Sequence, residues 1–576
     1  MKRWFKYIKP YWPLFILGPL CMIVEVIGEV LMPQFLANII NAANSGELTS
    51  PESLKNMVIM IVIALVMMAG GVGGASFASK ASVNFAADLR SDLYAKVQKF
   101  SFANVDYFST GSLVTRLTND VTQIRNFIAM LMRMALRAPG MMIAGLVMAI
   151  LINPPLSTVF AVSIPLLLLT IFLLVRIGFK RFTAMQDRID GLNSTVQENI
   201  TNVRVVKSFV REDVEIDKFN EANGNLKDSG MAAFRIMIFL QPVMTIFMNL
   251  TVLAVILIGG SIVLNNGMEV GSLSQFVTYV TQILMSLLMI TFLIIMSSRA
   301  LASGRRIAEV QDVQIDVTDD GCAQPEKTVD SGNIEFRDVS FRYYKSSEDL
   351  VLKKINLRIE SGQTVGIIGS TGSGKTTLVS MIPRLYDVDE GQVLVDGVDV
   401  RDYALKNLRE GVGMVLQKNT LFSGSVKDNL LWGNENATDE EIVAAARHAQ
   451  ADKFITTFEQ GYDAPITKGG SNVSGGQKQR LCIARALLKQ PKILILDDST
   501  SAVDTATERQ IREAFRDELK DSTKIIIAQR ISSVKDADVI IVVNEGTVPG
   551  VGTHDELLSS NEEYKEIYES QTGKEG

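Results

Sequence analysis

A glycine-rich segment, GSTGSGKT, offers the clearest chemistry in this sequence. It spans residues 369–376 and matches the pattern G-x-x-x-x-G-K-T. Glycines allow backbone N–H groups to surround phosphates, Lys375 supplies a cation, and the Thr376 hydroxyl can ligate Mg²⁺. A strand-like run precedes the motif and a helix-like run follows it, which is the context that it requires. We therefore predict a nucleotide site formed by Ser370, Thr371, Gly372, Ser373, Gly374, Lys375, Thr376 and Thr377.

Carboxylates and an amide follow two further strand-like runs. In ILILDDSTSAVD (residues 493–504), four apolar residues lead directly into Asp497 and Asp498. A carboxylate at the end of a buried strand, downstream of a phosphate loop, is typical of Mg²⁺ coordination. An acid in an exposed turn is the alternative for Asp497, but it accounts less well for the strand. MVLQ places Gln417 where its amide can reach the metal or an attacking water. The predicted Mg²⁺ ligands are therefore Thr376, Gln417 and Asp497, with Asp498 as a candidate catalytic acid.

A second helix start has the features of a phosphate-binding site. The tetrapeptide SGGQ, formed by Ser474, Gly475, Gly476 and Gln477, precedes an apolar helical pattern. Ser474 can cap the helix, and the two glycines leave N–H groups open to an anion. A capped helix without any ligand is the alternative, and physical reasoning alone leaves it open.

These motifs lie in the second half of a chain that is too apolar to be wholly soluble. Of its 576 residues, 47% are hydrophobic and 21% are charged, and the mean hydropathy is +0.21. We expect a multidomain membrane protein: a six-helix, all-α transmembrane domain at 1–315, a linker at 316–332 and an α/β P-loop ATPase domain at 333–576. The net charge of −6 gives no indication of a nucleic-acid partner. The three cysteines have no metal-binding or disulfide spacing.

Six apolar stretches reach the length of about 20 residues that spans a bilayer. They lie near residues 14–36, 57–77, 128–152, 156–177, 237–264 and 273–296. Lys and Arg are concentrated before the first stretch, between the second and third, and between the fourth and fifth, whereas the other connections contain only Lys55. The positive-inside rule therefore places both termini and both long connections in the cytoplasm, with the protein in the cell membrane.

Several side chains within the predicted spans could line a substrate cavity. Glu25 and Glu29 share one helix face, and Arg133 and Arg137 share another. Ionisable groups in a bilayer face a cavity or pair with one another. A cavity for charged or amphipathic substrates and a salt-bridge cluster between helices are equally compatible with the pattern. Met285 and Met289 also lie on one face, and adaptable ligand contact and ordinary packing are both open.

The cassette motifs occur together in a known order. GSTGSGKT, VLQ, VSGGQKQR, ILILD and SAVD, placed after six spans, resemble a half-transporter of the ATP-binding cassette (ABC) exporter type. The resemblance implies that two half-transporters sandwich two ATP molecules with Mg²⁺. It also implies that Tyr343, or its neighbour Tyr344, stacks on adenine. Residues 474–477 would contact the ATP of the partner chain, and Asp504 would belong to the interface loop.

Two residues depart from the family pattern. The family usually has Glu where this chain has Asp498, and His where it has Gln529. A neutral amide cannot carry the charge of an imidazolium. This combination resembles the degenerate-site subunit of bacterial heterodimeric multidrug exporters. It predicts a different half-transporter, carrying the Glu and the His, as partner, together with membrane lipids and small amphipathic substrates. The alternatives are a homodimeric, slow ATPase that exports peptides or lipids, and a nucleotide-gated channel or regulatory membrane protein.

Overall fold

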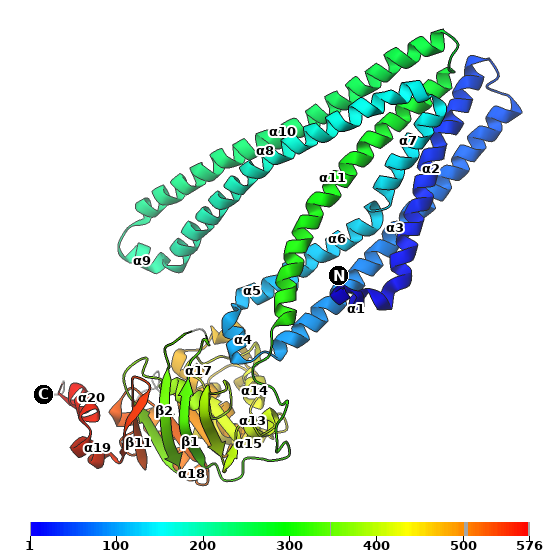
Figure 1. Ribbon diagram of the computed structural model, residues 1–576. Helices are drawn as coiled ribbons and strands as arrows, with labels where there is room; N and C mark the ends of the chain where they lie inside the picture. Colours follow the sequence, from blue (N-terminus) through cyan, green and yellow to red (C-terminus); the bar gives the residue numbers. More distant parts are fainter. Residues whose placement is uncertain (1, 346, 500–504, 574–576) are drawn as a thin grey trace. The chain divides into compact units, whose positions relative to one another are not determined.

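The computed structural model describes residues 2–345, 347–499 and 505–573 and divides the chain into two compact units (Figure 1). The first unit comprises residues 1–97 and 111–312, and the second comprises residues 98–110 and 313–576. The first is helical, and the second is an α/β unit that contains the phosphate loop.

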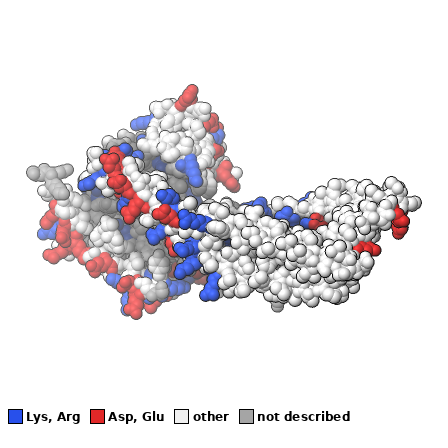
Figure 2. Space-filling view, turned by 90° about the horizontal axis from the view of Figure 1, so that it is seen from above, with Lys and Arg blue, Asp and Glu red and all other residues white. Residues whose placement is uncertain are grey.

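Long helices form the first unit, and they confirm the expected all-α domain with six spans. Within the described residues, six helical segments are long and apolar enough to cross a membrane. Much of the surface of this unit carries neither acidic nor basic side chains (white in Figure 2). Its principal helices are α2 (Trp12–Asn44), α3 (Pro51–Gln98), α6 (Val121–Met134), α7 (Arg137–Ile152), α8 (Pro154–Thr201), α10 (Glu212–Leu264) and α11 (Val270–Asp312).

Several of these helices extend well beyond a bilayer. Helix α8 has 48 residues, which is about 72 Å at 1.5 Å per residue, more than twice a hydrocarbon core of about 30 Å. Helices α8 and α10 lie side by side along their length (Figure 1) and are joined by the short helix α9 (Val203–Ser208). The two long, basic connections therefore contain helical extensions of the spans, as their apolar spacing predicts.

Glycines allow α2 and α3 to approach closely. A Cβ atom added to Gly28 of α2 would lie 2.3 Å from Cγ of Met67, and one added to Gly74 of α3 would lie 2.3 Å from Cε of Met22. Small residues at such a contact permit the dense packing that holds helices together in lipid. The core of the unit lies among α2, α7, α8, α10 and α11, where the buried Tyr279 donates a hydrogen bond to the carbonyl of Val30 at 2.7 Å.

The second unit contains a six-stranded sheet, with the strand order β12-β11-β3-β10-β9-β6. All neighbours pair in parallel except β11 and β12. The strands are almost wholly apolar, as buried parallel strands usually are. Their bounds are β3 (Thr364–Ile368), β6 (Val412–Val415), β9 (Ile493–Asp497), β10 (Thr523–Ile527), β11 (Val539–Asn544) and β12 (Thr547–Gly552).

A smaller antiparallel sheet and a set of helices complete the α/β unit. The sheet has the order β2-β1-β4-β5, formed by β1 (Ile334–Phe341), β2 (Leu352–Ile359), β4 (Glu390–Val395) and β5 (Val398–Asp399). The helices include α12 (Lys375–Ser380), α14 (Val426–Leu431), α15 (Asp439–His448), α17 (Gly475–Leu488), α18 (Thr505–Glu518), α19 (His554–Ser560) and α20 (Glu562–Thr572). The short helix α4 (Phe102–Tyr107) also belongs to this unit.

The polar segment 316–332 lies against the α/β unit. The N–H of Gln324 donates to the carbonyl of Asp402 at 2.9 Å, and Val329 is buried in the core. Asp396 accepts hydrogen bonds from the N–H groups of residues 330–333. These contacts fix the course of a segment whose composition predicts a linker.

Candidate nucleotide-binding site

The strand register brings the predicted site residues to one edge of the large sheet. Ile527 of β10 pairs with Ile367 of β3 on one side and with Asp497 of β9 on the other. The carboxyl ends of these parallel strands therefore align, and ligands of open α/β sheets bind at such an edge. A pocket of about 400 Å³ lies there, lined by Tyr343, Val351, Thr371, Gly372, Gly374, Lys375, Thr376, Thr377, Gln417, Asp497, Asp498, Ile527 and Gln529.

The phosphate loop requires glycine at its first position. Gly369 has φ = 155°, and a Cβ atom there would lie 2.0 Å from the carbonyl oxygen of Val543. The Lys375 Nζ donates to the carbonyls of Gly369 at 2.9 Å and Ser370 at 2.7 Å, so the loop holds its own cation. Burial lowers the pKa of Lys375. Ser370 and Ser373 belong to the loop without lining the pocket, and Ser373 is buried.

The predicted metal ligands meet at the start of α12. The Thr376 hydroxyl donates to Asp497 Oδ1 at 3.0 Å, and Gln417 lines the same pocket. The other carboxylate oxygen of Asp497 is buried and has no hydrogen-bond partner among the described residues. Burial raises the pKa of Asp497. An unpartnered carboxylate oxygen beside a hydroxyl and an amide suits Mg²⁺, which prefers oxygen ligands and accompanies nucleotide phosphates.

Asp498, the candidate catalytic acid, is held by a side-chain amide. Gln529 Nε2 donates to Asp498 Oδ2 at 2.8 Å, and Gln417 lines the same pocket. Burial raises the pKa of Asp498. Its backbone has φ = 45°, and its carbonyl accepts a hydrogen bond from Gln479 Nε2 at 3.4 Å. The two atypical residues are therefore in direct contact.

Tyr343, and not Tyr344, faces the pocket. The Tyr343 hydroxyl shares a hydrogen bond with Thr377 Oγ1 at 2.9 Å, whereas Tyr344 is 64% exposed and does not line the pocket. The Tyr343 ring contacts Tyr386, with ring centroids 5.3 Å apart. Tyr386 in turn contacts Phe102 of α4, and its hydroxyl donates to Asp106 at 2.8 Å. The sequence alone does not indicate a role for Tyr386, because one aromatic residue in RLYDV forms no recognisable pattern.

The SGGQ segment begins α17 at a different place from the pocket. Ser474 Oγ accepts from the N–H of Gln477 at 3.2 Å, and Gln477 Oε1 accepts from the N–H of Ser474 at 2.9 Å, which together form a capping box. Ser474 and Gly475 are exposed. This helix start is therefore well ordered and open to another molecule. Asp504 lies outside the described residues.

The candidates in the membrane unit lie in different surroundings. Arg137 of α7 bridges both acids of α2: its Nη1 lies 2.9 Å from Glu25 Oε1 and its Nη2 lies 2.7 Å from Glu29 Oε1. The structure thus has the salt-bridge cluster, one of the two interpretations of this pattern. Met285 lines an apolar pocket described below, whereas Met289, Glu25 and Glu29 do not line that pocket.

The buried charge of Asp497 leads to the first testable prediction. A raised pKa in the folded state contributes stability below the unfolded pKa, and that contribution is lost as the pH rises through the folded pKa. Asp497→Asn should therefore raise the unfolding temperature of the nucleotide-free protein at neutral pH. It should also remove the stabilisation by Mg²⁺ and ATP, which is about 2.7 kcal/mol at a hundredfold excess over Kd. Thermal unfolding with and without Mg²⁺–ATP measures both effects.

Asp521→Asn is the control for Asp497→Asn, because Asp521 is exposed and lies outside the pocket. The control should unfold like the unmodified protein and keep its response to Mg²⁺–ATP. If Asp497→Asn keeps the full Mg²⁺-dependent response, Asp497 does not hold the metal.

Comparison with known proteins identifies both units. The family described as the ABC transporter transmembrane region matches residues 15–287, and the ABC transporter family matches residues 352–501. The uncharacterized ABC transporter ATP-binding protein YfiB of Bacillus subtilis is 38% identical over 580 residues, which cover 100% of this chain and 99% of that protein. The putative multidrug export ATP-binding/permease protein YgaD of B. subtilis is 33% identical over 582 residues, covering 99% and 98%.

A solved structure shares the whole fold. The structure of a bacterial Atm1-family ABC exporter with ATP bound covers 98% of this chain and is itself covered to 98%, with a TM-score of 0.77 and 24% sequence identity. Three findings indicate the same family. They are the six helices long and apolar enough to span a membrane, the nucleotide pocket at the carboxyl edge of a parallel sheet, and the relatives that match over nearly their full length. The chain belongs to the ABC transporter family, as a multi-pass half-transporter of the exporter type with its transmembrane region and ATP-binding cassette in one polypeptide.

Proposed function

We propose that this chain is one half of a heterodimeric ABC exporter of amphipathic or hydrophobic compounds, and that its own ATP site hydrolyses slowly. We also propose that the transmembrane domain comprises residues 1–315 and the ATP-binding cassette comprises residues 333–576. We place the protein in the cell membrane, with both termini in the cytoplasm, because Lys and Arg are concentrated in the long connections.

The contact between Asp498 and Gln529 carries the proposal. Aspartate is shorter than glutamate by one C–C bond, about 1.5 Å, and a misplacement of about 1 Å can reduce a rate on the order of 100-fold. The 2.8 Å hydrogen bond from Gln529 further engages the carboxylate. Gln529 is uncharged, so it cannot supply the positive charge of a protonated histidine to a γ-phosphate. Both changes weaken hydrolysis and leave nucleotide binding intact.

The rest of the pocket supports retention of ATP. Lys375, Thr376 and Asp497 would hold the phosphates and Mg²⁺, with Gln417 at the metal and Tyr343 beside the base. Bound ATP contributes a γ-phosphoryl group whose transfer to water drives transport in this family. Here Asp498 is hydrogen-bonded to the amide of Gln529, so it is poorly placed to orient a water molecule. The site would hold its nucleotide for longer than a glutamate-containing site.

The exposed start of α17 supports a role in the partner's site. Ser474, Gly475, Gly476 and Gln477 keep the signature sequence, and their helix start is ordered by a capping box. N–H groups at a helix N-terminus favour phosphate. A partner chain that carries the Glu and the His would therefore form a complete hydrolytic site with this segment, and Asp504 would lie in the loop that links the two sites.

The name of one relative supports the substrate class. YgaD is described as a putative multidrug export protein and matches this chain over nearly its full length. An apolar pocket that includes Met285 lies in the membrane unit. We therefore infer small amphipathic compounds as cargo and membrane lipids as surroundings, with no role for nucleic acid.

Purification from native membranes tests the proposal. Affinity purification of this chain under mild conditions should recover a second, different ABC half-transporter in equal amount, identified by its mass. The complex should hydrolyse ATP, whereas this chain purified alone should not. A homodimer of this chain with rapid ATP hydrolysis would refute the heterodimer.

A further inference from the structure

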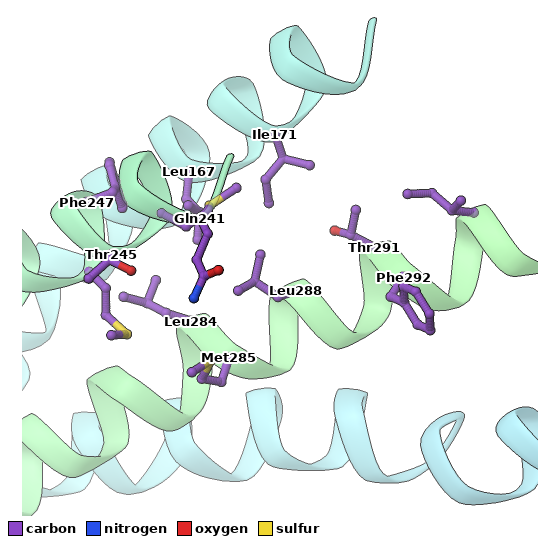
Figure 3. A pocket seen from close by; sticks show the side chains of 13 residues that line it. Leu167, Ile171, Gln241, Thr245, Phe247, Leu284, Met285, Leu288, Thr291 and Phe292 are labelled. Atoms are coloured by element: carbon purple, nitrogen blue, oxygen red, sulfur yellow. The ribbon is translucent and has the colours of Figure 1, made fainter. Parts of the chain in front are cut away.

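The membrane unit contains a ligand-sized, partly open pocket bordered by three helices of this chain. Helices α8, α10 and α11 surround about 410 Å³ (Figure 3), which lies within the range of about 300–1,000 Å³ typical of small-molecule sites. The lining residues are Leu167, Ile171, Gln241, Met244, Thr245, Phe247, Met248, Leu284, Met285, Leu288, Thr291, Phe292 and Ile295. We call this cavity the α8–α10–α11 pocket.

Among the residues that the structure describes, no acidic or basic side chain lines the α8–α10–α11 pocket. Its walls are leucine, isoleucine, phenylalanine and three methionines, which adapt to ligands of different shape. Glu25 and Glu29 of α2 do not supply a negative charge to the pocket, because they are paired with Arg137 and do not line it. An ion would lose its hydration here without gaining a counter-charge, which is strongly unfavourable.

Two polar groups of α10 lack internal partners. Gln241 extends from α10 toward Leu288 of α11 (Figure 3). Neither its amide nor the Thr245 hydroxyl, one turn further, has a hydrogen-bond partner in the described part of the chain. By contrast, the Thr291 hydroxyl donates to the carbonyl of Leu287 at 2.9 Å. An unpaired amide in a membrane span is costly, so polar side chains there normally bind something.

A proline adds a further acceptor beside these groups. Pro242 lies inside α10 and has no N–H, so it cannot donate to the carbonyl of Ile238, four residues earlier. Ile238, Gln241, Pro242 and Thr245 line an adjoining open cavity of about 560 Å³. The Gln241 amide, the Thr245 hydroxyl and the Ile238 carbonyl therefore provide hydrogen-bond donors and acceptors at one end of an otherwise apolar pocket.

We propose that the α8–α10–α11 pocket binds an uncharged, mainly apolar compound whose single hydrogen-bonding group is taken by Gln241 and Thr245. This inference rests on the proposed export function and specifies its substrate class. Gln241 lies near the start of the predicted span 237–264, and Phe292 near the end of the predicted span 273–296. The pocket therefore lies in the half of the bilayer nearer to the long helical extensions, which is the proposed cytoplasmic side.

A matched pair of probes tests the charge of the ligand. Triphenylphosphine oxide is an uncharged, apolar molecule with one strong hydrogen-bond acceptor, and tetraphenylphosphonium has a similar apolar body with a positive charge. Equilibrium binding of each probe is measured to the transporter purified from native membranes and held in lipid nanodiscs. The neutral probe should bind the unmodified transporter more tightly than the cation does. Tighter binding of the cation would overturn the proposal.

Substitutions on α10 test the residues. Gln241→Leu should weaken binding of the neutral probe about fivefold, since a hydrogen bond contributes about 1 kcal/mol and a tenfold change corresponds to about 1.4 kcal/mol. Thr245→Val should weaken it several-fold, and Gln241→Glu should reverse the preference in favour of the cation. Thr170→Val is the control, because Thr170 lies on α8 outside the pocket and donates to its own helix. The control should bind the neutral probe within about twofold of the unmodified transporter.

The remaining outcomes separate a transported compound from a membrane lipid. Size-exclusion elution establishes that each variant is assembled. Unchanged binding of the neutral probe to assembled Gln241→Leu would overturn the proposal. Displacement of a co-purified phospholipid by the probe, with no effect of Gln241→Leu, would show that the pocket holds an acyl chain and would also overturn it. Failure of the heterodimer proposal is distinguishable, because it shows in the chain composition of the purified transporter and not in probe binding.

Discussion

Replacing Ser474 by arginine should reduce ATP hydrolysis by the assembled transporter at least about 100-fold. Ser474 is exposed and begins the helix whose N–H groups are proposed to face the partner's ATP. Arginine would remove the serine oxygen and place a long side chain over Gly475 and Gly476. Loss of one donor at a developing anion reduces a rate by about 10²–10³. Steady-state ATPase activity of the complex with its partner measures the effect.

Thr438→Arg is the matched control for Ser474→Arg. Thr438 is also exposed, and it forms the same kind of capping box at the start of α15, where its Oγ1 accepts from the N–H of Glu441 at 3.3 Å. Loss of a helix cap costs about 1 kcal/mol in either case. The control complex should therefore retain most of its activity. Equal losses in both variants would mean that Ser474 acts only on the stability of its helix.

Restoring the usual family residues should activate this chain's own site. The double variant Asp498→Glu with Gln529→His should hydrolyse ATP about 100-fold faster at this site, because the carboxylate gains about 1.5 Å of reach and the imidazole can carry a positive charge. The measurement uses complexes in which the partner's proposed catalytic glutamate is replaced by glutamine, so that turnover comes from this site alone. Gln529→His without the second change should have a small effect, because the carboxylate remains short.

If the double variant is inactive, Asp498 and Gln529 are not the cause of slow ATP hydrolysis at this site. The site would then need a feature besides Asp498 and Gln529 that prevents hydrolysis. Retained Mg²⁺–ATP stabilisation in thermal unfolding is the control, since neither substitution touches Lys375, Thr376 or Asp497.

The sequence predicts the nucleotide site well because local motifs carry most of it. The residues from Gly369 to Thr376 form one continuous loop, and Asp497 ends an apolar strand. The contact between Asp498 and Gln529 depends instead on β9 and β10 being parallel neighbours, with Asp497 opposite Ile527. Strand order is a tertiary property, so the sequence identifies both residues without showing that they are hydrogen-bonded.

The membrane unit shows where sequence patterns are insufficient. Helical spacing places Glu25 and Glu29 on one face, but only the packing of α2 against α7 shows that Arg137 pairs with both. Met285 and Met289 share a similar pattern, yet only Met285 lines the α8–α10–α11 pocket. Gln241 is the single polar residue in the run IMIFLQPVM (residues 236–244), and its importance comes from helices α8 and α11, which are distant in the sequence.

The ATPase activity of the complex containing Asp498→Asn tests the central claim most directly. The substitution removes the charge of the candidate catalytic acid and keeps its size and its position in the pocket. If this chain's site holds ATP while the partner's site hydrolyses it, the assembled transporter should keep nearly all of its ATPase activity. A near-complete loss of activity would contradict this account, because it would show that Asp498 performs the hydrolysis.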